Sequence, residues 1–200
     1  MACASPLPPT KMIKSIDIID LGDQQMTLSV NAIRSGGRLV DVMRQLAGGV
    51  CVITAGRAPA RTGYTGTAVF SLSVEPERVT ISVGRGSSSY PVIRDTRAFG
   101  LNILRWDQQA VADRFAGRGG VKGEARYGGA EWFTGPSGVS LLVGALASAD
   151  CAVEEVIERH SHALIIGDPL SFSAIPVDDA LIFWRSRYAS SRAVDKVAAE

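Results

Sequence analysis

The sequence lacks the short motifs that mark the common hydrolytic, metal-dependent and nucleotide-hydrolysing sites. Its 200 residues contain no GxSxG, HExxH or CxxC motif and no P-loop, which argues against serine hydrolases, zinc enzymes and NTPases. Cysteine is scarce: Cys3, Cys51 and Cys151 are odd in number and far apart, so they form neither a disulfide framework nor a zinc-binding spacing. Cys51 and Cys151 stand inside apolar runs, which predicts buried thiols in a reducing compartment.

An excess of charge of one sign is also absent. The chain carries 21 Lys and Arg against 20 Asp and Glu, a formal net charge of +1, and these residues are scattered evenly. Neither nucleic acid nor an anionic membrane surface is therefore expected as a partner. No apolar run approaches the roughly 18 residues needed to cross a bilayer, and the N-terminus has no apolar signal region. The sequence predicts a soluble, cytoplasmic protein.

The sequence does contain enough apolar residues for one domain, arranged largely in short runs. Hydrophobic residues make up 46% of the 200, which suits one domain with a sizeable core. Runs of β-branched and apolar residues bounded by glycine or polar residues predict strands. The predicted strands outside the central segment cover 50–55, 98–104, 141–157 with a break at Ala149 and Asp150, 162–174 and 180–184.

Three segments have the spacing or the end signals of helices. They are 35–47, ended by Gly48 and Gly49, a short helix that starts at Ser88, and 107–115 with Asp107 as its N-cap. Strands are many, helices are few, and the two do not alternate regularly. The pattern therefore favours a mainly β protein, a closed antiparallel barrel with helices at its edge, over a Rossmann sheet.

The segment from Gly63 to Ser89 is a candidate binding site, and it predicts two strands joined by a turn at Glu75 and Pro76. The second of these strands covers 78–83. Near the start of the segment, small residues leave room for a flat ligand to lie against the backbone. These residues are Thr65, Gly66, Thr67 and Ala68.

A loop rich in Gly and Ser follows the second strand and precedes the short helix. It contains Arg85, Ser87, Ser88 and Ser89. Hydroxyl groups, a guanidinium and the free N–H groups of a helix N-terminus suit a phosphate. The dinucleotide fingerprint GxGxxG is not completed, because Ser89 occupies the third glycine position. From the spacing alone, a phosphate cradle and an ordinary loop both stay open.

Two histidines, His160 and His162, are separated by one residue, which on a strand places both side chains on one face. A metal pair, a single functional imidazole and a half-buried structural imidazole are all compatible with this spacing. No cysteine lies nearby and no acidic residue is an obvious partner beyond Asp168, so we expect no metal. Without an evident catalytic acid or nucleophile, the reactive chemistry is expected to belong to a bound cofactor.

Seven segments, in order and spacing, resemble the short-chain flavin reductases that serve two-component flavin-dependent monooxygenases. They are GYTGTAVFSLSVEP, VGRGSSSYPVI, AFGLNIL, QQAVADRFAG, ALASADCAVEE, SHALIIGDP and LIFWRSRY, and the similarity covers 38–188. The resemblance implies an FMN-binding split β-barrel, a Greek-key antiparallel barrel that forms a homodimer. It also implies that NADH or NADPH reduces FMN or FAD, which is then delivered to a monooxygenase component.

The resemblance also implies roles for individual residues. Thr65, Gly66 and Thr67 match the segment whose backbone lies along the isoalloxazine ring, and Ser71 matches a serine near the ribityl chain and phosphate. Arg85 with Ser87–Ser89 matches the phosphate loop. His162 matches a histidine on the nicotinamide side, where it would act in catalysis.

The sequence departs from the family pattern at three places. Thr65-Gly66-Thr67 stands for the usual Thr-Ala-Asn, Pro76-Glu77 for a double proline, and His160-Ser161 for Gly-Asp. The last change bears on the choice of pyridine nucleotide, and Arg187 and Tyr188 are the alternative nicotinamide-side residues.

The expected organisation is an N-terminal arm over 1–34, a flavin reductase-like domain over 35–190 and a tail over 191–200. Two other functions stay open at this point. One is an electron-transfer protein that carries FMN and turns over no pyridine nucleotide. The other is a reductase of another acceptor, such as a corrinoid, on the same fold.

Overall fold

The computed structural model describes residues 38–176 and 179–192, so the predicted arm and Cys3 lie outside the described residues. The helices are α1 (Leu39–Met43), α2 (Ser89–Thr96) and α3 (Gln109–Phe115), with 3-10 turns at Trp106–Gln108, Arg118–Gly120 and Gly123–Tyr127. The strands are β1 (Gly48–Gly49), β2 (Cys51–Ala55), β3 (Thr62–Gly66), β4 (Val69–Val74), β5 (Glu77–Gly84), β6 (Ala98–Ile103), β7 (Trp132–Thr134), β8 (Ser140–Leu142), β9 (Ala147–Arg159), β10 (His162–Ala174), β11 (Leu181–Trp184) and β12 (Arg187–Ser190). None of the described helices is long and apolar enough to span a membrane.

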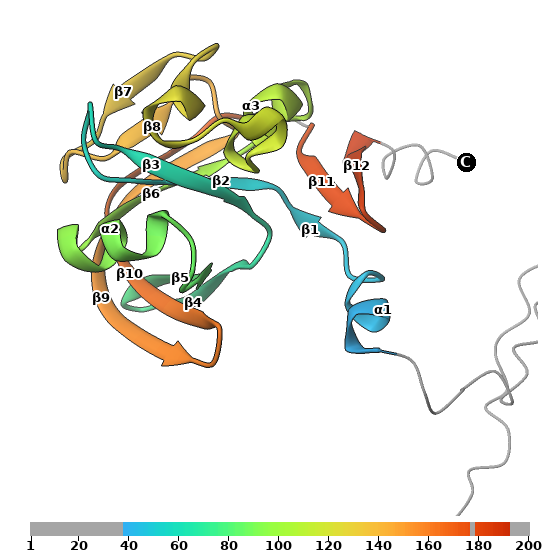
Figure 1. The fold of residues 1–200 in the computed structure, drawn as a ribbon, viewed down its shortest axis with the longest axis horizontal. Helices are drawn as coiled ribbons and strands as arrows, with labels where there is room; N and C mark the ends of the chain where they lie inside the picture. Colours follow the sequence, from blue (N-terminus) through green and yellow to red (C-terminus); the bar gives the residue numbers. More distant parts are fainter. Residues whose placement is uncertain (1–37, 177–178, 193–200) are drawn as a thin grey trace, which may run out of the picture. The chain divides into compact units, whose positions relative to one another are not determined.

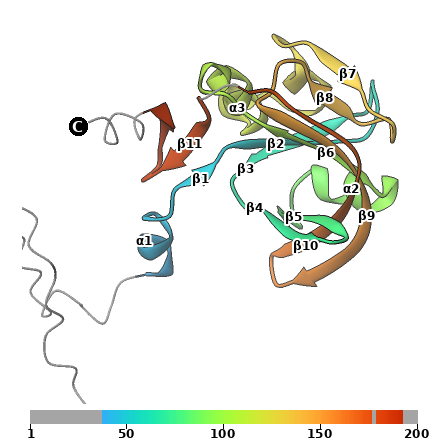
Figure 2. The same ribbon diagram turned by 180° about the vertical axis from the view of Figure 1, so that it is seen from behind.

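One sheet of seven strands forms the body of the domain, in the order β3-β2-β6-β9-β10-β5-β4, and every neighbouring pair is antiparallel. A second sheet has the order β1-β11-β12, and β7 pairs with β8. The large sheet curls round so that β4 and β5 lie beneath β3, which is visible from both sides (Figure 1, Figure 2). The mainly β architecture with a few helices is therefore confirmed.

The sheet is split between β3 and β4, so the prediction of a closed barrel is corrected here. One strand was expected from Gly63 to the turn at Glu75, but the chain breaks at Thr67 and Ala68. The part before the break pairs with β2 and the part after it pairs with β5, at the opposite edge of the sheet. Beside the break, Ser82 N donates to Ala68 O at 3.0 Å, which extends the pairing of β4 with β5, and the Tyr64 hydroxyl on β3 donates to Ser82 O at 2.9 Å.

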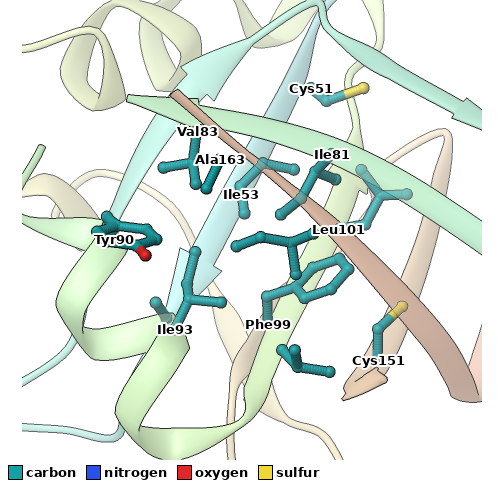
Figure 3. Packing of buried hydrophobic residues seen from close by; sticks show 13 residues of the cluster. Cys51, Ile53, Ile81, Val83, Tyr90, Ile93, Phe99, Leu101, Cys151 and Ala163 are labelled. Atoms are coloured by element: carbon teal, nitrogen blue, oxygen red, sulfur yellow. The ribbon is translucent and has the colours of Figure 1, made fainter. Parts of the chain in front are cut away.

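β2 contributes side chains to two separate apolar clusters of the domain. All five of its residues are buried, and alternate side chains of a strand point to opposite faces. Ile53 points into the curled sheet, where it packs with Ile81, Phe99 and Leu101 (Figure 3). Val52 points outward into a second cluster beneath α3. A strand covered on both faces reads as a continuous apolar run, which is why 50–55 was recognisable as a buried strand.

The buried thiols are confirmed for the two described cysteines. Cys51 and Cys151 are free and buried. Burial raises the pKa of each thiol from 9.0 to about 12, because the apolar interior disfavours the charged thiolate.

The helix expected over 35–47 is shorter than predicted, and its first residues lie outside the described part. α1 covers five residues, none of them buried, and Leu39 is 74% exposed. Gly48 and Gly49 do not end this helix, since they pair with β11 as a short strand. The apolar spacing of this segment therefore does not reflect packing against the domain.

Two further expectations are wrong at the level of single residues. Ala149 and Asp150 do not interrupt a strand: both lie inside β9, and the chain turns earlier, at Gly144, where φ is +72°. Asp107 does not cap α3, whose N-cap is Gln108. The Asp107 carboxylate instead accepts hydrogen bonds from the guanidinium of Arg105, the residue two positions earlier in the sequence.

Candidate functional site

β3 offers an unpaired backbone edge beside the predicted ligand segment. It is the edge strand of the large sheet, with β2 as its one neighbour. In a strand, alternate backbone groups point to the two sides, so half of those in β3 point away from β2. At this free edge the Arg126 guanidinium donates to Gly63 O. Thr65 Oγ1 donates to Ala112 O in α3 at 2.6 Å, which fixes the helix against the strand.

A cavity of about 220 Å³, which we call the tyrosine cavity, lies at the Gly66 end of β3. It is lined by Val50, Thr65, Gly66, Thr67, Ala116, Arg118, Phe183 and Tyr188. The structure thus brings the predicted ring-binding residues together with Tyr188, one of the two alternative nicotinamide-side residues. An aromatic wall and a strip of free backbone form a suitable surface for one side of a flat heterocycle.

The position of Tyr188 is fixed by charged residues that the sequence did not single out. Its hydroxyl donates to Asp113 Oδ1 at 2.9 Å, and the Arg118 guanidinium lies 5.5 Å from the centre of its ring. Arg118 also forms an ion pair of 2.9 Å with Asp113. Burial, followed by the hydrogen bond to Asp113, raises the pKa of Tyr188 to about 12. The phenol is therefore neutral at physiological pH.

A second cavity, which we call the basic cavity, lies at the Thr62 end of β3 and has a volume of about 560 Å³. Its lining residues are Pro59, Ala60, Arg61, Thr62, Gly86, Ser88, Val92, Lys122, Gly123, Glu124 and Arg126. Thr62 and Gly66 are four residues apart, about 13 Å at 3.3 Å per residue. Each cavity has lining residues from β3 and from the segment 116–126, so these two parts of the chain bound both cavities.

The predicted phosphate loop connects β5 with α2, and its serines do different things. The Ser88 and Thr62 hydroxyl oxygens lie 3.1 Å apart. Ser87 Oγ accepts a hydrogen bond from Tyr90 N at 3.3 Å, across the start of α2. Ser89 is fully buried, and its hydroxyl has no partner among the described residues.

Arg85 does not line the basic cavity. Its guanidinium forms an ion pair of 2.8 Å with Glu158 and donates to His160 O at 3.1 Å. The Tyr90 hydroxyl also donates to Glu158. The charge that the sequence assigned to a phosphate is therefore matched by a carboxylate in this structure.

The two histidines do not share a strand face, which corrects the prediction. His160 lies in the turn between β9 and β10 with φ at +50°, because the chain reverses there. His162 is the first residue of β10 and is paired with Gly84, the residue before Arg85. Its side chain is exposed rather than half-buried, and its Nδ1 lies 2.9 Å from Ser161 Oγ. His162 lines neither cavity, and it lies beside the phosphate loop.

The remaining predicted site residues lie apart from the two cavities. Ser71 is on β4, where it lines an apolar groove of about 470 Å³ with Phe70 and Phe172. Ala68 lies just before β4, and its carbonyl accepts the hydrogen bond from Ser82 N. Arg187 is exposed at the start of β12. The described residues contain no cluster of three or more His, Cys, Asp or Glu that could hold a metal ion.

Sequence reasoning missed the charged residues of the segment 113–126, namely Asp113, Arg118, Lys122, Glu124 and Arg126. Their signal was a loop rich in Gly, Lys and Arg, which had no periodicity to connect it with β3. Only the folded chain brings this loop to the free edge of the strand.

Comparison with known proteins gives a consistent result. The flavin reductase-like domain matches residues 43–192. The FMN reductase (NADH) RutF of Enterobacter cloacae is 29% identical over 74% of this chain and 89% of its own length. The reductase subunit HsaB of a flavin-dependent monooxygenase from Rhodococcus jostii is 30% identical over 76% of this chain and 75% of its own length.

A solved structure agrees with these relatives. The NADH:FAD oxidoreductase SgcE6 of Streptomyces globisporus, in complex with NAD and FAD fragments, superposes with a TM-score of 0.69 and 25% identity. The match covers 76% of this chain and 89% of that protein. The chain therefore belongs to the flavin reductase-like domain family, and its fold is the split barrel expected from the resemblance.

Proposed function

We propose that this protein is an NADH-dependent flavin reductase that supplies reduced flavin to a partner monooxygenase. The observation that carries the proposal is the free edge of β3, which has the tyrosine cavity at one end and the phosphate loop at the other. The relatives named as FMN reductase and as monooxygenase reductase subunit support the same activity. FMN or FAD is the acceptor, and NADH is the donor.

The residues present fit a flavin. In flavin mononucleotide a flat ring is separated from a phosphate by a ribityl chain, and β3 offers an analogous separation of about 13 Å over four residues. In this arrangement the backbone of Thr65–Thr67 lies along the ring, and Tyr188 stands at the wall of its cavity. Ser87 and Ser88 at the start of α2 hold the phosphate, with Arg85 as its cation, whereas the fully buried Ser89 does not reach it.

When bound, the flavin supplies the acceptor of the hydride that leaves the nicotinamide. The protein needs no acid of its own for this transfer, so its residues act by placing the reactants. Backbone N–H groups at the free edge of β3 stabilise negative charge that develops at the ring edge. His162, exposed beside Gly84 and Arg85, contacts the pyridine nucleotide.

A second copy of the chain is the expected partner of an exposed apolar surface on β4 and β10. Its side chains are Phe70, Leu72, Val74, Leu164, Leu170 and Phe172. Phe70, Val74 and Phe172 line the apolar groove that contains Ser71, and exposed apolar surface of this kind marks interaction sites. Light scattering at micromolar concentration should give a homodimer. A monomer would count against this assembly.

A reductase and a flavin carrier differ in how they hold the flavin, which gives a direct test. A reductase that delivers reduced flavin to another protein must release it, so the purified protein should be nearly colourless and should oxidise NADH only when flavin is added. A protein that stays yellow through gel filtration and oxidises no NADH would be a carrier, and the proposed activity would be wrong.

A further inference from the structure

The basic cavity contains more positive than negative charge. Arg61, Lys122 and Arg126 line it together with one acidic residue, Glu124. Glu124 is matched by Arg61, which donates to both of its carboxylate oxygens at 2.7 to 3.0 Å. Arg61 also lies 3.9 Å from the centre of the Tyr127 ring, so this pair is part of the wall.

The two other cations have no carboxylate partner among the described residues. Within residues 38–176 and 179–192, the Arg126 guanidinium donates only to backbone carbonyls, those of Val121 and Gly63. Lys122 is exposed, and the described part of the chain provides neither an ion pair nor a hydrogen bond for its side chain. Two uncompensated charges therefore face one cavity, a strong attraction for a polyanion.

The position of the cavity specifies the kind of anion. Gly86 and Ser88 form part of its lining, and α2 begins at Ser89, so the positive end of an eight-residue helix lies beside the two cations. The volume of about 560 Å³ lies within the range of small-molecule sites, roughly 300 to 1,000 Å³. There is thus room beyond the serine loop for more than one phosphate group.

We propose that Lys122 and Arg126 form a second phosphate subsite, which binds the second phosphate group of a dinucleotide's diphosphate when the first lies at Ser87 and Ser88. This inference rests on the proposed function, because it takes the ligand to be a nucleotide bound along β3. Two dinucleotides carry a diphosphate in this reaction, FAD and NADH. The chemistry at the subsite is the same for both, and the binding experiments below distinguish them.

The test compares wild-type protein with Lys122→Ala and Arg126→Gln in equilibrium titrations with riboflavin, FMN, FAD and NADH. Lys122 is exposed, so its replacement leaves the fold intact. Arg44→Ala is the matched control, because Arg44 is an exposed cation at the C-cap of α1 that does not line the cavity. Inorganic pyrophosphate serves as a competing ligand.

If FAD is the source of the diphosphate, Lys122→Ala should weaken FAD binding at least about tenfold, the effect of losing one hydrogen bond to a charged group. Riboflavin, FMN and the Arg44→Ala control should be unchanged. If NADH is the source, its affinity should fall by the same factor instead. In either case pyrophosphate should displace the dinucleotide from the wild type and much less from the variant.

Two results would overturn the inference. Weakening of FMN by the same factor as FAD would place the first phosphate in the basic cavity, so no second subsite would exist. Unchanged affinities for all four ligands in both variants would exclude any phosphate from the cavity. Failure of the proposed function looks different, because the wild-type protein would then oxidise no NADH with any added flavin, whatever the titrations of the variants show.

Discussion

Arg85 provides a quantitative prediction for the flavin phosphate, because its present partner is a weak one. The Arg85 and Glu158 side chains are 44% and 42% exposed, and ion pairs at such exposure contribute about 0 to 1 kcal/mol. A hydrogen bond between charged groups contributes about 1.5 to 3 kcal/mol. Exchange of Glu158 for a phosphate is therefore favourable by roughly 0.5 to 3 kcal/mol.

Arg85→Ala should accordingly weaken FMN binding about twofold to more than a hundredfold, and riboflavin binding very little, because riboflavin has no phosphate. Glu158→Gln is the matched variant: it removes the competing carboxylate, so FMN should bind up to about fivefold more tightly. Both affinities can be measured by quenching of flavin fluorescence. Equal weakening of riboflavin and FMN by Arg85→Ala would refute the assignment of Arg85 to the phosphate.

The remaining predictions concern the nucleotide, the packing of β3 and the buried thiols. His162→Ala should raise the Michaelis constant for NADH and leave FMN affinity and melting temperature nearly unchanged, since the side chain is exposed. His160→Ala should change none of these quantities. A melting temperature lower by several degrees with normal kinetics in His162→Ala would indicate a structural role for His162. Gly63→Ala should destabilise the fold by 1 kcal/mol or more, because its Cβ would lie 2.5 Å from Ile53 O and 2.6 Å from the Phe115 ring; unchanged stability in urea would contradict this packing. Burial of the neutral Cys51 and Cys151 thiols raises their pKa values, so their contribution to stability is complete below pH 9.0 and is lost as pH rises from 9.0 towards about 12. Between pH 8 and pH 10 the Cys51→Ala/Cys151→Ala variant should therefore lose less stability than the wild type. Equal losses would contradict the burial of the thiols.

Elements whose burial shows in a local run of apolar residues, or whose ends carry a local signal, could be predicted from the sequence. β2 is buried on both faces and β10 is bounded by a turn and by polar residues, so a local apolar pattern was sufficient for 50–55 and 162–174. α2 was recognisable because Ser88 precedes it in a loop that ends a strand. In these cases the signal and the structure lie within the same few residues.

The split of the sheet could not be predicted in this way. The residues on both sides of Thr67 and Ala68 have the same strand-like composition, and only their distant partners, β2 and β5, differ. Such pairing depends on contacts far apart in the sequence, which no local pattern contains.

The candidate site shows the same limit. Thr65, Gly66 and Thr67 were found because small residues cluster beside a strand, and Tyr188 was found through the family resemblance. Lys122 and Arg126 were not singled out, because an isolated cation in a glycine-rich loop usually lies in solvent. Their role becomes visible only when the loop is folded against β3.

The most direct test of the central claim is the rate of NADH oxidation by the purified protein, with riboflavin, FMN or FAD added in separate assays. The account predicts no oxidation without flavin and rapid oxidation with FMN or FAD, together with formation of reduced flavin in equal amount when oxygen is excluded. NADH oxidation that does not depend on added flavin, or none with any of the three, would contradict it.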